Sequence, residues 1–197
     1  MNKKSVSATI LIMFLVLFFS VVGSCFSFFV YKYSRTLVEN VVLAADESIE
    51  IYEDEELKKR ISQLKLSDME LGLKPATGEV DAETQVPSTI DDNGTSEGYY
   101  STIYVKSLGN FRISISNIMI ESDHDETLVK EERKNIYIGI KDLKNSVKTL
   151  EHDGIEICRY SDVSKPIKIT FLIWLGSFAS EELEGAKISF DIDFVAI

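Results

Sequence analysis

Hydrophobic and polar positions follow three successive patterns along this chain. Residues 8–31 form an unbroken run without a charged side chain. In residues 34–66 the apolar positions recur every three or four residues, and from residue 99 they alternate with polar ones. These patterns are typical of a membrane-spanning helix, an amphipathic helix and β-strands. The sequence therefore predicts a mainly β protein, in which a transmembrane helix and a juxtamembrane helix precede an antiparallel β-sandwich, jelly-roll or immunoglobulin-like, over residues 99–197.

The first apolar run is long enough to cross a lipid bilayer as a helix, which needs about 20 residues. Residues 1–7 carry two lysines, and such a basic flank stays in the cytoplasm. We therefore expect residues 8–31 to contact the bilayer and the carboxy-terminal domain to lie outside the cell membrane. Lys32 and Arg35 on the far side make the charge bias that sets this orientation small.

Three fates of this segment are open from the sequence. It can stay uncleaved as a single-pass anchor. Val22-Gly23-Ser24-Cys25 resembles the lipobox of bacterial lipoproteins, in which Cys25 would be lipidated and would become the first residue. Cleavage before Phe28 would instead give a secreted protein. The apolar run continues through Val30, beyond the roughly 7–15 residues of a signal-peptide core, and this favours the anchor.

Residues 34–66 carry one apolar stripe at helical spacing, which predicts an amphipathic helix. The register slips between Tyr52 and Leu57, so a long coiled coil is not expected. Two roles are open for this helix: self-association, or packing of its stripe on its own domain. The positions of the stripe are Leu37, Val38, Val41, Val42, Ala45, Ile49, Tyr52, Leu57, Ile61 and Leu64.

Residues 67–98 are rich in Ser, Thr, Asp, Glu, Pro and Gly and have few large apolar residues. Such a composition cannot bury enough surface to offset the entropy of ordering. We expect a flexible linker here.

The alternation from residue 99 onward predicts at least six short strands, and so many strands in one domain indicate a sandwich. Within Phe111–Ile120 the apolar phase shifts, which predicts a β-bulge or a strand that crosses between sheets. Trp174 is expected in the core or at its edge. The predicted strands are Tyr100–Lys106, Asn110–Ile120, Ile136–Leu143, Ile155–Tyr160, Lys165–Leu175 and Lys187–Ala196.

Charge is distributed unevenly over the 197 residues. Residues 1–35 hold four of the 21 basic residues and no acid, so residues 36–197 contain 17 basic and 32 acidic residues, a net charge of −15. A region with this net negative charge repels nucleic acid, so we expect no nucleic-acid partner.

A thiol nucleophile would need Cys158 with His152 as its base. Cys158 is expected on a strand and His152 beyond an Asp-Gly turn, a spacing that defines no geometry. We therefore predict no catalytic residue, no bound cofactor and an ordinary free thiol.

Acidic side chains provide two candidates for a metal site, because hard cations bind carboxylate oxygens. Asp123, Asp125 and Glu126 flank a histidine in a predicted loop, and Asp191 and Asp193 project from one face of the last strand. The order of these residues does not match an EF-hand loop, and a polar outer face explains the strand pair equally well.

Two stretches near the carboxyl end carry a family resemblance. Residues 167–176 (IKITFLIWLG) and residues 183–194 (LEGAKISFDIDF), together with the aromatic end of the signal segment at Phe26-Ser-Phe-Phe, resemble small exported proteins of Gram-positive bacteria of the TasA/camelysin type. In that comparison the two stretches correspond to the closing strand pair. The resemblance implies a jelly-roll-like sandwich at the bacterial surface, in some members a subunit of an extracellular fibre or matrix, and it carries over no catalytic residue.

Together these features predict a membrane-anchored or exported bacterial surface protein whose acidic sandwich acts in binding or assembly, with exposed strand edges as the working surface. A pilin-like subunit is the first alternative, since pilins also join an apolar amino-terminal helix to a β-domain. A surface hydrolase that uses Cys158 or the acidic loop is the second.

Overall fold

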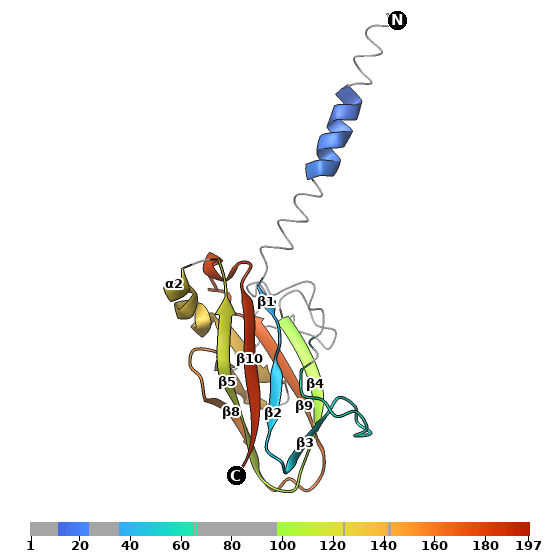
Figure 1. Ribbon diagram of the computed structural model, residues 1–197, viewed down its shortest axis with the longest axis vertical. Coiled ribbons are helices and arrows are strands. Elements are labelled where there is room, and N and C mark those ends of the chain that lie inside the picture. The colour runs from blue at the N-terminus through green and yellow to red at the C-terminus, as the bar shows by residue number, and fades with distance from the viewer. Residues whose placement is uncertain (1–11, 24–35, 65, 67–97, 124, 142) are drawn as a thin grey trace, which may run out of the picture. The chain divides into compact units, whose positions relative to one another are not determined.

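A computed structural model describes residues 12–23, 36–64, 66, 98–123, 125–141 and 143–197, and the chain divides into two compact units, Met1–Ser34 and Arg35–Ile197 (Figure 1). In the first unit residues 12–23 are helical with exposed side chains. No helix within the described ranges has the length and apolarity needed to span a membrane. The remainder of the apolar run 8–31 lies outside these ranges.

The second unit is a sandwich of two five-stranded sheets, so the mainly β prediction is confirmed (Figure 1). All described strand pairs are antiparallel except those of β1 and β2, which run parallel to β10. The first sheet has the order β1–β10–β5–β8, with β2 also paired to β10, and comprises β1 (Leu37–Val38), β2 (Val42–Ala45), β5 (Phe111–Glu121), β8 (Ile155–Tyr160) and β10 (Lys187–Ala196). The second has the order β3–β4–β9–β6–β7 and comprises β3 (Ile49–Tyr52), β4 (Gly98–Ser107), β6 (Ile136–Ile140), β7 (Leu143–Thr149) and β9 (Ile167–Leu175).

The predicted amphipathic helix over residues 34–66 is wrong, because this segment forms β1, β2 and β3. Its apolar side chains lie in the sandwich core, where Val38, Val41, Leu43, Ile49 and Ile51 are all buried. The stripe is therefore covered by the domain itself. The sandwich begins near residue 35 instead of residue 99.

Residues 59–64 complete the side of the sandwich on which β2 and β3 lie. The N–H of Leu43 in β2 donates to the carbonyl of Ser62 at 2.9 Å, and the N–H of Ile61 donates to the carbonyl of Ile51 in β3 at 3.0 Å. One segment therefore binds the outer strands of both sheets. Of the predicted linker 67–98, residues 67–97 lie outside the described residues, and Gly98 is the first residue of β4.

The strand predictions after residue 99 agree with β4, β5, β8, β9 and β10 within a few residues. The exception is the predicted strand Ile136–Leu143, which ends at Ile140 and is followed by a separate strand, β7. The last two strands, β9 and β10, lie in opposite sheets, so they are not hydrogen-bonded neighbours as a closing strand pair would be.

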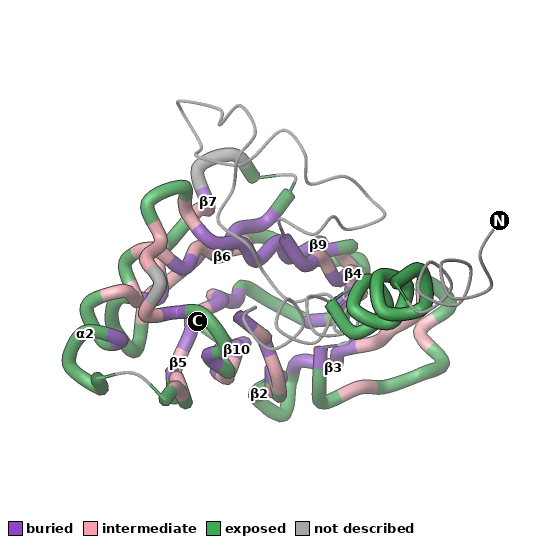
Figure 2. Tube along the Cα trace, turned by 90° about the horizontal axis from the view of Figure 1, so that it is seen from above, coloured by how far each residue is buried: buried purple, intermediate pink, exposed green. Residues whose placement is uncertain are grey.

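The core lies between the two sheets, where the buried positions of facing strands meet (Figure 2). Phe171 of β9 and Phe194 of β10 meet edge to face across it, with ring centroids 6.5 Å apart. Trp174, expected in the core or at its edge, is buried, and with Leu172 it forms a second hydrophobic cluster separate from the main core. There its ring stacks on that of Tyr137, with centroids 5.5 Å apart and an angle of 12° between the planes.

The predicted irregularity in Phe111–Ile120 is a β-bulge. Residues Ser116 and Met119 of β5 face Asp191 and Ser189 of β10, so Asn117 and Ile118 together oppose one residue. Asn117 has a positive φ of 52°, a conformation that asparagine adopts more readily than most residues.

Candidate functional site

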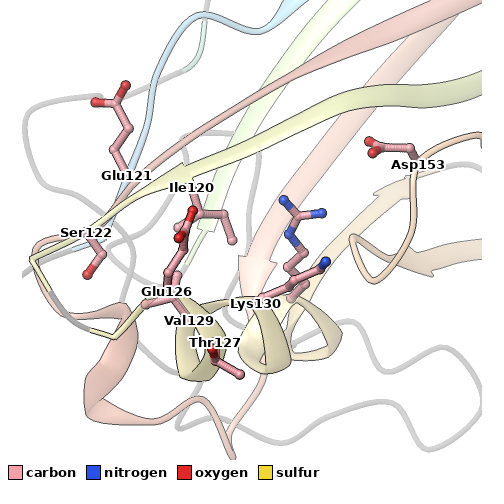
Figure 3. A pocket seen from close by; sticks show the side chains of 9 residues that line it. Ile120, Glu121, Ser122, Glu126, Thr127, Val129, Lys130 and Asp153 are labelled. Atoms are coloured by element: carbon pink, nitrogen blue, oxygen red, sulfur yellow. The ribbon is translucent and has the colours of Figure 1, made fainter.

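An open groove of about 1070 Å³ lies beside this bulge, between the end of β5 and a short helix, α2 (Glu126–Glu131) (Figure 3). The end of β5 forms one wall and α2 another, while the turn before β8 contributes Asp153. The side chains at the groove are Ile120, Glu121, Ser122, Glu126, Thr127, Val129, Lys130, Arg133 and Asp153.

Two charged side chains at the groove bind the backbone of Ile118. The N–H of Ile118 donates to Oδ1 of Asp153 at 2.8 Å, and Nη2 of Arg133 donates to the carbonyl of Ile118 at 2.8 Å. The bulge removes Ile118 from regular pairing, and buried backbone groups without a partner are costly. Asp153 and Arg133 therefore hold the bulge in place, and both are committed to the fold.

The groove exists because β8 is shorter than the neighbouring β5. The β8 ladder ends where Ile155 faces Ile115, and the N–H of Gly154 closes it by donating to the carbonyl of Ile115 at 2.7 Å. β5 continues to Glu121, and no described strand pairs with it on that side beyond this point. Helix α2 and the following 3-10 helix (Glu132–Asn135) lie beside the uncovered part.

The acidic residues proposed as metal ligands do not converge. Asp125 caps α2, because its Oδ1 accepts the N–H groups of Thr127 at 2.9 Å and Leu128 at 3.3 Å. Glu126 lines the groove, and Asp123 is exposed in the preceding loop. His124 lies outside the described residues. No group of three potential metal ligands occurs among the residues that were placed.

Asp191 and Asp193 alternate with the buried Ile192 and so share the outer face of β10. Oδ2 of Asp191 accepts a hydrogen bond from Nδ2 of Asn117 at 2.7 Å. That contact ties the side chain of the bulge residue to the neighbouring strand, which gives Asp191 a structural role.

Cys158 and His152 have the wrong environments for a nucleophile and its base. Cys158 packs against the core, and burial raises the pKa of its thiol to about 12. A nucleophilic cysteine needs a lowered pKa, since the thiolate is the reactive form. The His152 side chain is 77% exposed and lies 3.6 Å from a carboxylate oxygen of Glu151.

Lowered carboxyl pKa values mark surface ion pairs outside the groove. The hydrogen bond from Lys106 lowers the pKa of Glu50, and that from Arg159 lowers the pKa of Glu156. Glu156 and Arg159 are both on β8, where charged side chains oppose pairing of the open edge with another chain.

Lys130, Arg133 and Asp153 were not among the candidate site residues drawn from the sequence. The phase shift in β5 was the available signal, since a bulge frees backbone groups that need partners. It did not reveal which side chains supply them. Cys25, the candidate for lipidation, lies outside the described residues.

Comparison of the chain with models of protein families, with curated proteins and with solved structures gave no match.

Proposed function

We propose that this protein is a membrane-anchored or exported bacterial surface protein whose acidic sandwich acts by binding or assembly and not by catalysis. The observation that carries the proposal is the groove beside α2. The groove is open and lined by charged side chains of both signs. Two of these, Asp153 and Arg133, hydrogen-bond the backbone of Ile118 and so stabilise the fold. Such a surface fits recognition of a partner.

The chemistry of the titratable groups supports a binding role. The thiol of Cys158 has a raised pKa, and Asp125 and Asp191 are engaged in structural hydrogen bonds. A catalytic centre needs groups with pKa values matched to their task and within reach of one another. The raised pKa of Cys158 does not suit a nucleophile, and no group of three potential metal ligands occurs among the described residues.

The sequence before the sandwich supports its location. The uncharged run 8–31 is long enough for a membrane anchor, and it ends only a few residues before Thr36, the first described residue of the sandwich. This run therefore supports attachment of the sandwich to the membrane.

We also assign the sandwich to the jelly-roll type and not the immunoglobulin-like type. From β4 to β10 the chain passes between the two sheets at every step but one, β6 to β7. Such repeated crossing is typical of Greek-key sandwiches with eight strands or more.

The test is expression of the full chain in a Gram-positive host, with intact mass, cell fractionation and protease digestion of unbroken cells. We expect a full-length mass in the membrane fraction and a sandwich that external protease can cut. A mass that begins at Phe28 in the medium, or a lipid on Cys25, would replace the anchor by secretion or lipid attachment. A sandwich protected in intact cells and cut only after lysis would contradict the proposal.

A further inference from the structure

The part of β5 that β8 leaves uncovered presents an open strand edge inside the groove. Ile120 lies opposite Ile188 of β10 in the ladder. The carbonyl of Ile188 accepts the N–H of Glu39 at 2.7 Å, so the backbone of Ile188 is directed toward β1 and away from β5. In an antiparallel ladder, this makes Ile120 and Ile188 a pair that exchanges no hydrogen bonds.

The N–H and carbonyl of Ile120 therefore face the groove. The orientation agrees with that of Ile118, two residues earlier, whose backbone groups are bound on the same side by Asp153 and Arg133. Ile120 has no such partner in the described parts of the chain, and its side chain is half-buried. The N–H and carbonyl of Ile120, spaced as in a strand, are thus available to pair with a peptide bound in the groove.

The charges beside this edge indicate what kind of guest fits. Asp153 and Arg133 are committed to Ile118, which leaves Glu121, Glu126 and Lys130 as exposed charges at the groove. The groove exposes two carboxylates and one ammonium group, and residues 36–197 carry a net charge of −15. The groove should therefore attract a peptide with positively charged side chains.

We propose that the groove binds an extended basic peptide segment of another protein, which pairs with the backbone of Ile120 as a short added strand and places a Lys or Arg beside Glu126. Strand addition of this kind takes its affinity from main-chain hydrogen bonds and its specificity from alternate side chains. The groove volume of about 1070 Å³ is enough for a few residues of extended chain. This inference rests on the proposed binding function and names its site and partner.

The test uses the full chain in an uncharged detergent and a fluorescent probe peptide, acetyl-Thr-Lys-Val-Lys-Thr-amide, with binding read by fluorescence polarisation. We expect saturable binding that weakens about fivefold in Glu126→Gln, the upper range for one exposed ion pair. Glu55→Gln removes the same charge from an exposed position outside the groove and should leave the affinity unchanged. A peptide with Glu in place of both Lys should bind more weakly than the basic peptide.

Strand pairing has a further signature in the probe itself. Adjacent amides of a β-strand point in opposite directions, so methylation of one amide nitrogen should weaken binding about tenfold, while methylation of its neighbour has little effect. Ile120→Pro should weaken binding likewise, because it removes the N–H that faces the groove and keeps the ladder with β10. Thermal unfolding of each variant checks that the fold is intact.

The inference is overturned if the basic peptide does not bind, if Glu126→Gln and Glu55→Gln weaken binding equally, or if both methylated peptides bind like the parent. These outcomes leave the proposed function standing when the sandwich is found outside the cell. A sandwich found inside the cell removes the proposed function whatever the peptide does.

Discussion

Oδ1 of Asp153 accepts the backbone N–H of Ile118 at 2.8 Å, across 35 residues of sequence. This contact joins the turn before β8 to the bulge in β5. Arg133 completes the arrangement by binding the carbonyl of the same residue. Through Ile118, the bulge in β5, the turn before β8 and the 3-10 helix that carries Arg133 are held together at the groove.

We expect Asp153→Ala to lower the free energy of unfolding by about 1–3 kcal/mol, the cost of leaving a part-buried donor without a partner. Urea denaturation followed by circular dichroism measures the change. Asp123→Ala removes an exposed acid near the same groove and should change the free energy by less than about 0.5 kcal/mol. Equal effects of the two substitutions would show that the contact with Ile118 contributes nothing.

The domain boundary can be tested with two fragments. A fragment of residues 35–197 should unfold cooperatively, because it contains β1 to β3 and their buried side chains. A fragment of residues 99–197 lacks core residues such as Val38, Ile49 and Ile51 and should show no cooperative transition. Differential scanning calorimetry of both fragments decides the matter. A sharp transition in the shorter one would mean that the first three strands are dispensable.

Cys158 should react slowly with alkylating agents in the folded protein. Its pKa of about 12 against an ordinary 9.0 reduces the thiolate fraction at pH 8 about a thousandfold. Iodoacetamide labelling of a Cys25→Ser protein, followed by mass spectrometry with and without urea, measures the ratio. Similar rates in the two states would show that the thiol is accessible and ionised.

The same thiol makes stability depend on pH at the alkaline end. Its pKa is higher in the folded state than in the unfolded chain, so its contribution is complete below about pH 9 and is lost as the pH rises toward 12. Wild type should therefore lose stability over this range more steeply than Cys158→Ala. Parallel curves of unfolding free energy against pH for the two proteins would contradict this expectation.

Trp174 is the only tryptophan, so its fluorescence reports on the cluster that it forms with Tyr137. Tyr137→Ala should shift its emission to longer wavelength and cost about 2 kcal/mol, from lost burial and lost stacking. Tyr104→Ala removes a ring from a different strand and should leave the emission maximum unchanged. An unshifted maximum in Tyr137→Ala would show that other groups shield the indole.

The strands β4, β5, β6, β8, β9 and β10 were predictable because each contains at least five alternating residues, and alternation reports directly which side chains face a core, whereas β7 was not predicted. The prediction of a helix over residues 34–66 was wrong for a physical reason. Their strands are only two to four residues long and are separated by turns, one of which contains Asn40 at a φ of 52°. Short alternating pieces interrupted in this way can place buried residues three apart, as in Val38 and Val41, and so imitate a helix.

The groove was less predictable than the fold. The phase shift in β5 indicated a bulge, but the partners of Ile118 come from two other segments, and pairing over that distance leaves no periodic signal. Trp174 shows the same limit, because alternation places it on the opposite face from Phe171 and Ile173 but does not reveal the ring of Tyr137 that covers it.

The parallel course of β2 and β10 has a mechanical consequence. The chain enters the sandwich at the start of β1 and leaves it at the end of β10, so tension between the two ends pulls β2 and β10 in opposite directions along their length. Their backbone hydrogen bonds are then loaded in shear and must break together, whereas an antiparallel pair pulled from one end opens bond by bond. We expect single-molecule stretching between residues 35 and 197 to require a larger force than stretching between residues 98 and 197, which bypasses this pair.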